Sequence, residues 1–157
     1  MTTRRPANGL TRRTMLTTSG LGLAGVLARP ATAQPTAEES ANIKVVNQFC
    51  AAFTAPLDWP RITSHLTAEC KYRATQTAPM VEGSAAIDAL LEGFVGSASA
   101  IEFEVVDTWA RGPVVVDDRI DRFTLPDQQL DIPVVGVFHL IDGKIAEWTD
   151  FVFDIEL

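Results

Sequence analysis

Three charged residues in the last third of the chain are placed where they could perform acid–base chemistry. Arg119 and Asp121 lie two residues apart, and Asp150 lies between Trp148 and Val152 in an aromatic segment. A carboxylate among apolar side chains is costly to bury unless it is paired, and the two forks of a guanidinium can bind two carboxylates at once. We therefore expect Arg119 to bridge Asp121 and Asp150.

An Asp–Arg–Asp set of this kind can hold its two carboxyl groups in different protonation states, one protonated and the other ionised. The concerted opening of a strained ring needs both, because a base takes a proton from water while an acid protonates the leaving oxygen. The same three residues are also compatible with a structural salt bridge, or with surface charges on the solvent face of a sheet.

Strands of one sheet are needed to bring these side chains together. Four segments alternate with a period of two and are separated by turn residues, which predicts four β-strands. These segments are residues 101–110, 114–124, 130–141 and 144–155. Asp142-Gly143 between the last two is typical of a type I′ hairpin, in which both central residues have positive φ. In the second segment, the residues that share one face are Val115, Asp117, Arg119, Asp121 and Phe123.

Helical patterns precede these strands. Thr36 and Glu39 form a capping box at the start of a predicted helix that runs to about Thr54. A short helix is expected over 59–66, an extended segment over 70–76 and an amphipathic helix over 83–96. This order predicts an α+β domain, in which a curved, mostly antiparallel sheet has helices packed on one face and encloses a pocket.

Several motifs carry a family resemblance. They are Asp118-Arg119-Ile120-Asp121, Gly136-Val137-Phe138-His139-Leu140, Asp142-Gly143-Lys144-Ile145 and Trp148-Thr149-Asp150-Phe151, in this order. The chain resembles the limonene-1,2-epoxide hydrolase family of the NTF2-like, SnoaL-like superfamily. The similarity spans nearly all of residues 34–157 and is densest over 116–154. It implies a cone-shaped fold, a homodimer and an epoxide hydrolase activity.

The resemblance also implies residue roles. Asp150 would be the general base, Asp121 the general acid that protonates the epoxide oxygen, and Arg119 the bridge between the two carboxylates. Tyr72, the only tyrosine, matches the tyrosine that helps to position the water. The family has an asparagine two residues later, where this chain has Ala74. Residues that could replace the missing asparagine are Thr75, Gln76 and Asn47.

The implied reaction is a one-step addition of water that needs no metal and no organic cofactor. Its substrate would be a small apolar epoxide, terpene- or steroid-like. The expected pocket residues are Trp109, Phe123, Val137 and Trp148, while Leu90, Leu91 and Phe94 are expected in the core. Two other classes stay open, namely an isomerase or cyclase of the ketosteroid isomerase or SnoaL type and a non-catalytic small-molecule binding module. An arginine between the acids favours an ionised pair over the apolar oxyanion site of an isomerase.

The first 33 residues differ in charge from the rest. They contain five arginines and no acidic residue, which leaves eight basic against 20 acidic residues in 34–157, a formal charge of −12. Arg12-Arg13, a mildly apolar stretch and Ala31-Thr32-Ala33 resemble a twin-arginine (Tat) signal peptide cleaved after Ala33. We therefore expect residues 34–157 to form a single domain, exported by the Tat machinery to the bacterial periplasm or beyond.

The remaining expectations concern partners and thiols. The acidic charge argues against a nucleic acid partner, and no apolar run is long enough for a stable membrane anchor as a plain helix. An outward apolar stripe supports the homodimer, because it is too apolar to face water comfortably. This stripe comprises Val114, Val116, Ile120, Phe151 and Phe153. Cys50 and Cys70 are expected to be core thiols, although an exported protein could also pair them.

Overall fold

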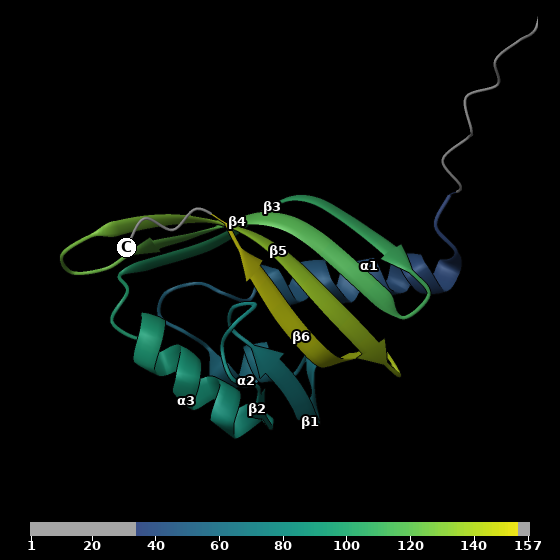
Figure 1. Ribbon diagram of the computed structural model, residues 1–157, viewed down its shortest axis with the longest axis horizontal. Coiled ribbons are helices and arrows are strands. Elements are labelled where there is room, and N and C mark those ends of the chain that lie inside the picture. Colours follow the sequence, from purple (N-terminus) through teal and green to yellow (C-terminus); the bar gives the residue numbers. More distant parts are fainter. Residues whose placement is uncertain (1–33, 154–157) are drawn as a thin grey trace, which may run out of the picture. The chain divides into compact units, whose positions relative to one another are not determined.

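The computed structural model describes residues 34–153, so the predicted signal segment 1–33 and residues 154–157 lie outside the described range. Three helices and six strands follow one another in this order: α1 (Ala37–Cys50), α2 (Trp59–Thr63), β1 (Leu66–Arg73), β2 (Val81–Glu82), α3 (Ser84–Val95), β3 (Ala100–Arg111), β4 (Val114–Thr124), β5 (Gln129–Ile141) and β6 (Lys144–Val152). The predicted α+β class is confirmed (Figure 1).

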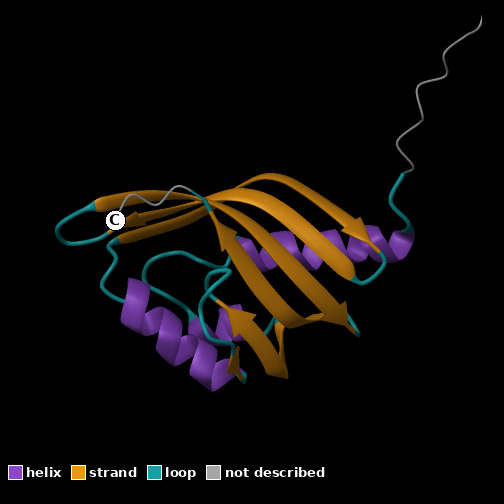
Figure 2. Cartoon of the chain, viewed as in Figure 1, coloured by secondary structure: helices purple, strands orange, loops and turns teal. Residues whose placement is uncertain are grey.

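The six strands form one curved sheet in the order β2-β1-β6-β5-β4-β3. β1 runs parallel to β6, and every other neighbouring pair is antiparallel. The helices cover one face of this sheet, with α1 packed along β3 and β4 and α3 against β1 and β2 (Figure 2). Side chains of β4 and β6 that point to the helix-covered face of the sheet can therefore pack against the helices.

α1 begins where the sequence predicts. The Thr36 hydroxyl accepts a hydrogen bond from the Glu39 amide (3.1 Å), and the Glu39 carboxylate accepts one from the Thr36 amide (2.7 Å). The helix ends at Cys50, earlier than expected, because two tight turns follow it. These turns bring Phe53 into the core, where its ring stacks on Phe103 with centroids 4.2 Å apart.

β1 begins at Leu66, four residues before the predicted start, because the Ile145 amide donates to the His65 carbonyl (2.9 Å) and aligns this segment with β6. A register shift between Leu66 and Lys71 interrupts the two-residue period there, which hides the strand in the sequence. The turn between β5 and β6 is the predicted one, since Asp142 (φ 49°) and Gly143 (φ 73°) both have positive φ.

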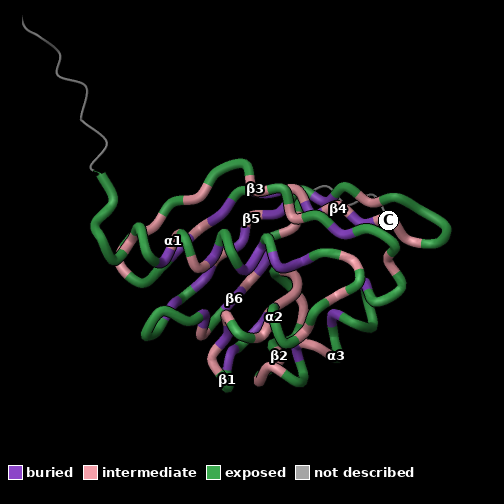
Figure 3. Tube along the Cα trace, turned by 180° about the vertical axis from the view of Figure 1, so that it is seen from behind, coloured by how far each residue is buried: buried purple, intermediate pink, exposed green. Residues whose placement is uncertain are grey.

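Burial alternates along β4 as predicted. The face shared by Arg119 and Asp121 is buried throughout, and the opposite face is exposed or half-buried (Figure 3). On β6 a bulge interrupts the two-residue alternation, because His139 pairs with Glu147 while Leu140 pairs with Ile145. Ile145 is thus buried at the base of the strand, and Trp148 and Asp150 lie beyond the bulge on the inner face.

Candidate active site

A buried arginine is the centre of the site. Arg119 is 1% exposed and projects from β4 into the enclosed side of the sheet. Its Nε donates to Asp121 Oδ1 (2.7 Å), and its Nη2 donates both to Asp150 Oδ1 (2.7 Å) and to Asp121 Oδ2 (3.2 Å). The structure thus brings the three predicted residues together, with Arg119 as the bridge between two carboxylates.

A third carboxylate, which the sequence reasoning did not assign to the site, completes the cluster. Asp117 Oδ1 accepts hydrogen bonds from Arg119 Nη1 and from the Gly136 amide, both at 2.9 Å. Gly136 lies between Asp117 and Asp150 in the sheet register, and a Cβ at this position would collide with Arg119 Nη1 and Asp117 Oδ1. A single glycine in the strand sequence was the available signal, since glycine in a strand often marks close approach.

Asp150 is held by two aromatic residues as well as by Arg119. Trp148 Nε1 donates to its Oδ1 (2.7 Å), and the Tyr72 hydroxyl donates to its Oδ2 (3.2 Å). Tyr72 on β1 and Trp148 on β6 are paired in register, and their rings stack with centroids 3.9 Å apart. The carboxylate of Asp150 is therefore fixed in orientation by donors from three strands.

The cluster shifts the pKa values of its members. Burial raises the pKa of Asp121 from 3.8 to about 6, although the nearby Arg119 opposes this. Burial likewise raises the pKa of Asp150, and burial together with the adjacent Asp150 raises the pKa of Tyr72 well above its usual range. Burial alone would lower the pKa of Arg119, but the surrounding carboxylates raise it, so the guanidinium stays charged.

The raised pKa of Asp121 predicts that stability depends on pH in an unusual direction. A carboxyl whose pKa is higher in the folded state stabilises the fold below pH 4, and this contribution is lost as the pH rises through 6. A difference of about two between the folded and unfolded pKa values of Asp121 corresponds to a stabilisation of about 3 kcal/mol. We expect the contribution of Asp121 to the free energy of unfolding to fall by about this amount over that range, and this contribution to be absent in Asp121→Asn.

Urea unfolding of residues 34–157 at pH 4, 5, 6 and 7 measures this dependence. Asp118→Asn is the matched control, because Asp118 is exposed on the outer face of the same strand. Equal pH profiles for Asp121→Asn and Asp118→Asn would contradict the prediction.

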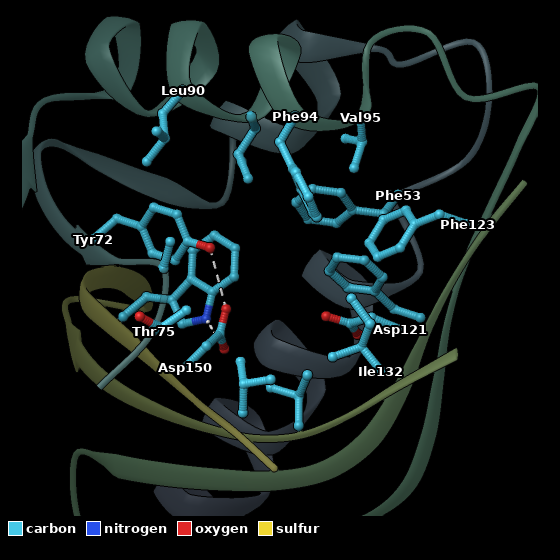
Figure 4. A pocket seen from close by; sticks show the side chains of 16 residues that line it. Phe53, Tyr72, Thr75, Leu90, Phe94, Val95, Asp121, Phe123, Ile132 and Asp150 are labelled. Carbon is cyan, nitrogen blue, oxygen red and sulfur yellow. Dashed lines mark hydrogen bonds between the residues drawn. The ribbon is translucent and has the colours of Figure 1, made fainter. Parts of the chain in front are cut away.

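An apolar cavity of about 280 Å³ opens beside the cluster. Asp121 and Asp150 lie on one side of it, with Tyr72 beside Asp150, and side chains of α3 such as Leu90 and Phe94 lie on the opposite side (Figure 4). The remaining lining residues are apolar or small: Phe53, Ala74, Thr75, Leu91, Val95, Phe103, Phe123, Ile132, Val134, Trp148 and Val152. The two carboxyl groups are therefore the charged groups that face this cavity.

A sequence model of the limonene-1,2-epoxide hydrolase catalytic domain matches residues 40–156. The chain belongs to the limonene-1,2-epoxide hydrolase family. No curated protein matches the chain in a sequence search.

Solved structures similar to this family member share its fold. An LEH-like epoxide hydrolase from M. tuberculosis is 23% identical with a TM-score of 0.65, covering 74% of this chain and 85% of that one. A protein described as a SnoaL-like polyketide cyclase from Jannaschia sp. CCS1 is 18% identical with a TM-score of 0.67, covering 76% and 90%. One described as a ketosteroid isomerase from Kribbella flavida is 17% identical with a TM-score of 0.61, covering 76% and 83%. These matches confirm the NTF2-like fold class predicted from the sequence.

Two residues predicted to line the pocket of this family member lie elsewhere. Trp109 is 48% exposed on the outer face of the sheet, where it pairs with Val116 on β4. Val116 in turn pairs with Val137 on β5, so Val137 also lies on the outer face. A bulge between Val105 and Asp107 reverses the alternation of β3, so Trp109 faces the opposite way from Phe103. Leu90, Leu91 and Phe94, which we expected in the core, line the cavity. The core prediction is confirmed for Leu91, which is buried, and is wrong for Leu90 and Phe94, which are 40% and 52% exposed.

The three candidates for the missing asparagine are also separated. The Gln76 side chain makes two hydrogen bonds to the backbone of Val152, both at 3.2 Å. Its Nε2 donates to the Val152 carbonyl, and its Oε1 accepts from the Val152 amide. Asn47 Oδ1 accepts from the Thr108 hydroxyl (2.8 Å), away from the cavity. Thr75 lines the cavity on the side of Tyr72 and Asp150 (Figure 4). It is therefore the one of the three whose position allows contact with a water bound there.

Other expectations concern thiols and metals. Cys50 and Cys70 are buried and not joined by a disulfide, as predicted for core thiols. Among residues 34–153, no set of three or more His, Cys, Asp or Glu side chains is arranged to hold a metal ion. Within that same range, no helix is both long and apolar enough to cross a membrane.

Proposed function

We propose that the chain is an epoxide hydrolase that adds water in one step to a small apolar epoxide and releases a vicinal diol. The observation that carries this proposal is the pair Asp121 and Asp150, which share the guanidinium of Arg119 and both face an apolar cavity. One carboxyl group can take a proton from a water while the other gives a proton to the oxygen of a substrate bound between them.

The hydrogen bonds favour Asp150 as the base. It accepts bonds from Arg119, Trp148 and Tyr72, and donors to a carboxylate favour its ionised form. Among residues 34–153, Asp121 accepts bonds from Arg119 alone. Burial raises the pKa of both carboxyl groups, that of Asp121 to about 6, so the difference between them lies in the number of donors. Asp121 is therefore the carboxyl group better suited to carry a proton and to act as the acid.

The proposed step conserves protons. Asp150 takes one proton from a water held by Tyr72 and Thr75, and the oxygen of that water forms a bond to one epoxide carbon as the carbon–oxygen bond of the ring breaks. Asp121 transfers its proton to the released oxygen. The step leaves Asp150 protonated and Asp121 ionised, and exchange with solvent after the diol departs restores the starting state. No covalent intermediate with the protein is formed.

The cavity supports an apolar substrate. Four phenylalanines and Trp148 contribute to its lining, and the polar groups are confined to the side of the two carboxylates. A terpene- or steroid-like epoxide would bury its hydrocarbon skeleton against α3 and place its oxygen beside Asp121, so that apolar burial supplies the binding energy.

An isomerase of the ketosteroid type is the second candidate, favoured by the fold shared with the Kribbella protein and by the Tyr72 hydroxyl beside Asp150. Such an enzyme needs an apolar oxyanion site with uncharged donors. Arg119 places a fixed positive charge between the two acids instead, which favours the hydrolase.

One experiment separates these functions. Residues 34–157 are incubated with limonene oxide in oxygen-18 water and, separately, with a Δ5-ketosteroid. The proposal expects a diol that carries one labelled oxygen. A shifted steroid double bond without diol would identify an isomerase, and the absence of both reactions would favour a binding module.

Assembly and export complete the proposal. We propose a homodimer formed through the outer face of the sheet, where Trp109, Phe151 and Phe153 are 38–51% exposed, and export of the protein by the Tat pathway to the periplasm or beyond. Sedimentation equilibrium of residues 34–157 measures the first. Fractionation of cells that produce the parent or an Arg12→Lys/Arg13→Lys variant measures the second, and equal distribution of the two would contradict it.

A further inference from the structure

Asp117 is the most buried carboxylate of the site and has no place in the proposed reaction. It is 0% exposed and does not line the cavity, so a substrate there cannot touch it. Its Oδ1 accepts from Arg119 Nη1 and from the Gly136 amide, and its Oδ2 accepts from the Cys50 thiol at 3.3 Å. Burial raises the pKa of Cys50 well above its usual range, which keeps this thiol a donor.

The charges of the cluster do not balance. Three carboxylates share one guanidinium, which leaves two negative charges in a buried site if all three are ionised. Bringing unbalanced charge into a site of low dielectric constant is costly, so at least one carboxyl group binds a proton. The proton goes where ionisation is supported by the fewest donors.

The donors differ between the three carboxylates. Asp117 accepts bonds from three separate groups on β4, β5 and α1, whereas within the described part of the chain Asp121 accepts only from Arg119. Hydrogen bonds from donors favour the ionised form. We propose that the buried charge of Asp117, held beside Arg119, keeps the proton of the cluster on Asp121. Asp117 is thus a positioning residue for the acid; its effect on turnover rests on the proposed function, whereas its effect on Asp121 does not.

The neighbours of Asp117 are consistent with this assignment. The charged or titratable groups that face it are Arg119 and Asp121 on its own strand, Cys50 on α1 and Asp150 on β6. Its partners in the flanking strands are Thr108 and Gly136, which carry no charge. Arg119 is the single cation in this set. After burial and the opposing effect of Arg119, the negative charge of Asp117 contributes to the raised pKa of Asp121.

The test compares Asp117→Asn with Asp118→Asn. Asparagine keeps the oxygen that accepts from Arg119 and Gly136, and it removes the charge together with the acceptor of the Cys50 thiol. Asp118→Asn removes the same charge from the exposed outer face of the strand. The carboxyl carbon-13 signal of Asp121 is followed against pH. We expect its midpoint to fall by about one pH unit in Asp117→Asn and to stay unchanged in Asp118→Asn. An unmoved midpoint, or an equal fall in both variants, would overturn the proposal.

Two further measurements keep the outcome clear. In the unsubstituted protein, Asp121 should be the first carboxyl group of the cluster to take up a proton as the pH falls; a different order would overturn the proposal even if Asp117→Asn fails to fold. If the parent forms diol, the alkaline limb of its kcat/KM profile should move to lower pH in Asp117→Asn. If the parent forms no diol, the proposed function fails, and the titration still decides the role of Asp117.

Discussion

Asp150→Asn and Asp121→Asn are each expected to lower the rate of diol formation by about 10²–10⁴-fold, the range usual for the loss of a general base or acid. An asparagine at 150 keeps an oxygen to accept from Arg119 and Trp148, but its amide cannot take a proton from water. The amide of an asparagine at 121 is too weak an acid to protonate the epoxide oxygen as the ring opens. Both changes preserve side-chain volume, so the loss should fall on kcat rather than on folding.

The measurement is the single-turnover rate with a cyclic epoxide that the parent hydrolyses. Asp118→Asn is again the matched control, and it should retain the parental rate because its side chain is exposed on the outer face. Circular dichroism of each variant checks that it is folded. Near-parental turnover by either Asp150→Asn or Asp121→Asn would refute the assignment of these residues as base and acid.

The contact between Arg119, Asp121 and Asp150 could be predicted because its determinants are local. β4 keeps a regular two-residue period over its whole length, and the type I′ turn at Asp142-Gly143 joins β6 to β5. Regular strands and a defined turn set which side chains share a face. Once β4 and β6 are known to lie in one sheet, the inward position of these charges follows from counting residues.

Other parts of the site depend on irregularities that leave little trace in the sequence. The bulge in β3 places Trp109 on the outer face, although the strict period would put it on the same side as Phe103. β5 is apolar almost throughout its second half, so alternation does not show that Phe138 faces inward and Val137 outward. Such continuous apolar segments are ambiguous by periodicity alone.

The place of Asp117 in the site cannot be predicted from the sequence for a different reason. The sequence placed it on the inner face of β4, but its partners Gly136 and Cys50 come from another strand and from α1. The sequence distance between these residues gives no hint of the contacts. The structure shows why position 136 is a glycine, because Arg119 occupies the space that a side chain there would fill.

Arg119→Met is expected to lower the free energy of unfolding at pH 7 by about 3–5 kcal/mol, the usual cost of removing one partner from a buried ion pair. Methionine fills much of the same volume but leaves Asp117, Asp121 and Asp150 buried without their shared cation. Arg119 lowers the pKa of Asp121 and Asp150 against the effect of burial, so both pKa values rise further in the variant. The carboxyl groups are then neutral at low pH, and the variant loses stability as the pH rises through their folded-state pKa values.

Urea unfolding of Arg119→Met at pH 4 and pH 7 tests this expectation, with Arg122→Met as the matched control. Arg122 lies three residues further along β4 on the outer face, where it pairs with Glu104 and Asp131 at the surface. Surface pairs are screened by solvent, so Arg122→Met should change stability little at either pH. Equal losses for the two variants, or a loss for Arg119→Met that does not grow with pH, would show that the guanidinium does not compensate the buried carboxylates. In that case the cluster would carry fewer negative charges than its geometry implies, and the assignment of Asp150 as an ionised base would fail with it.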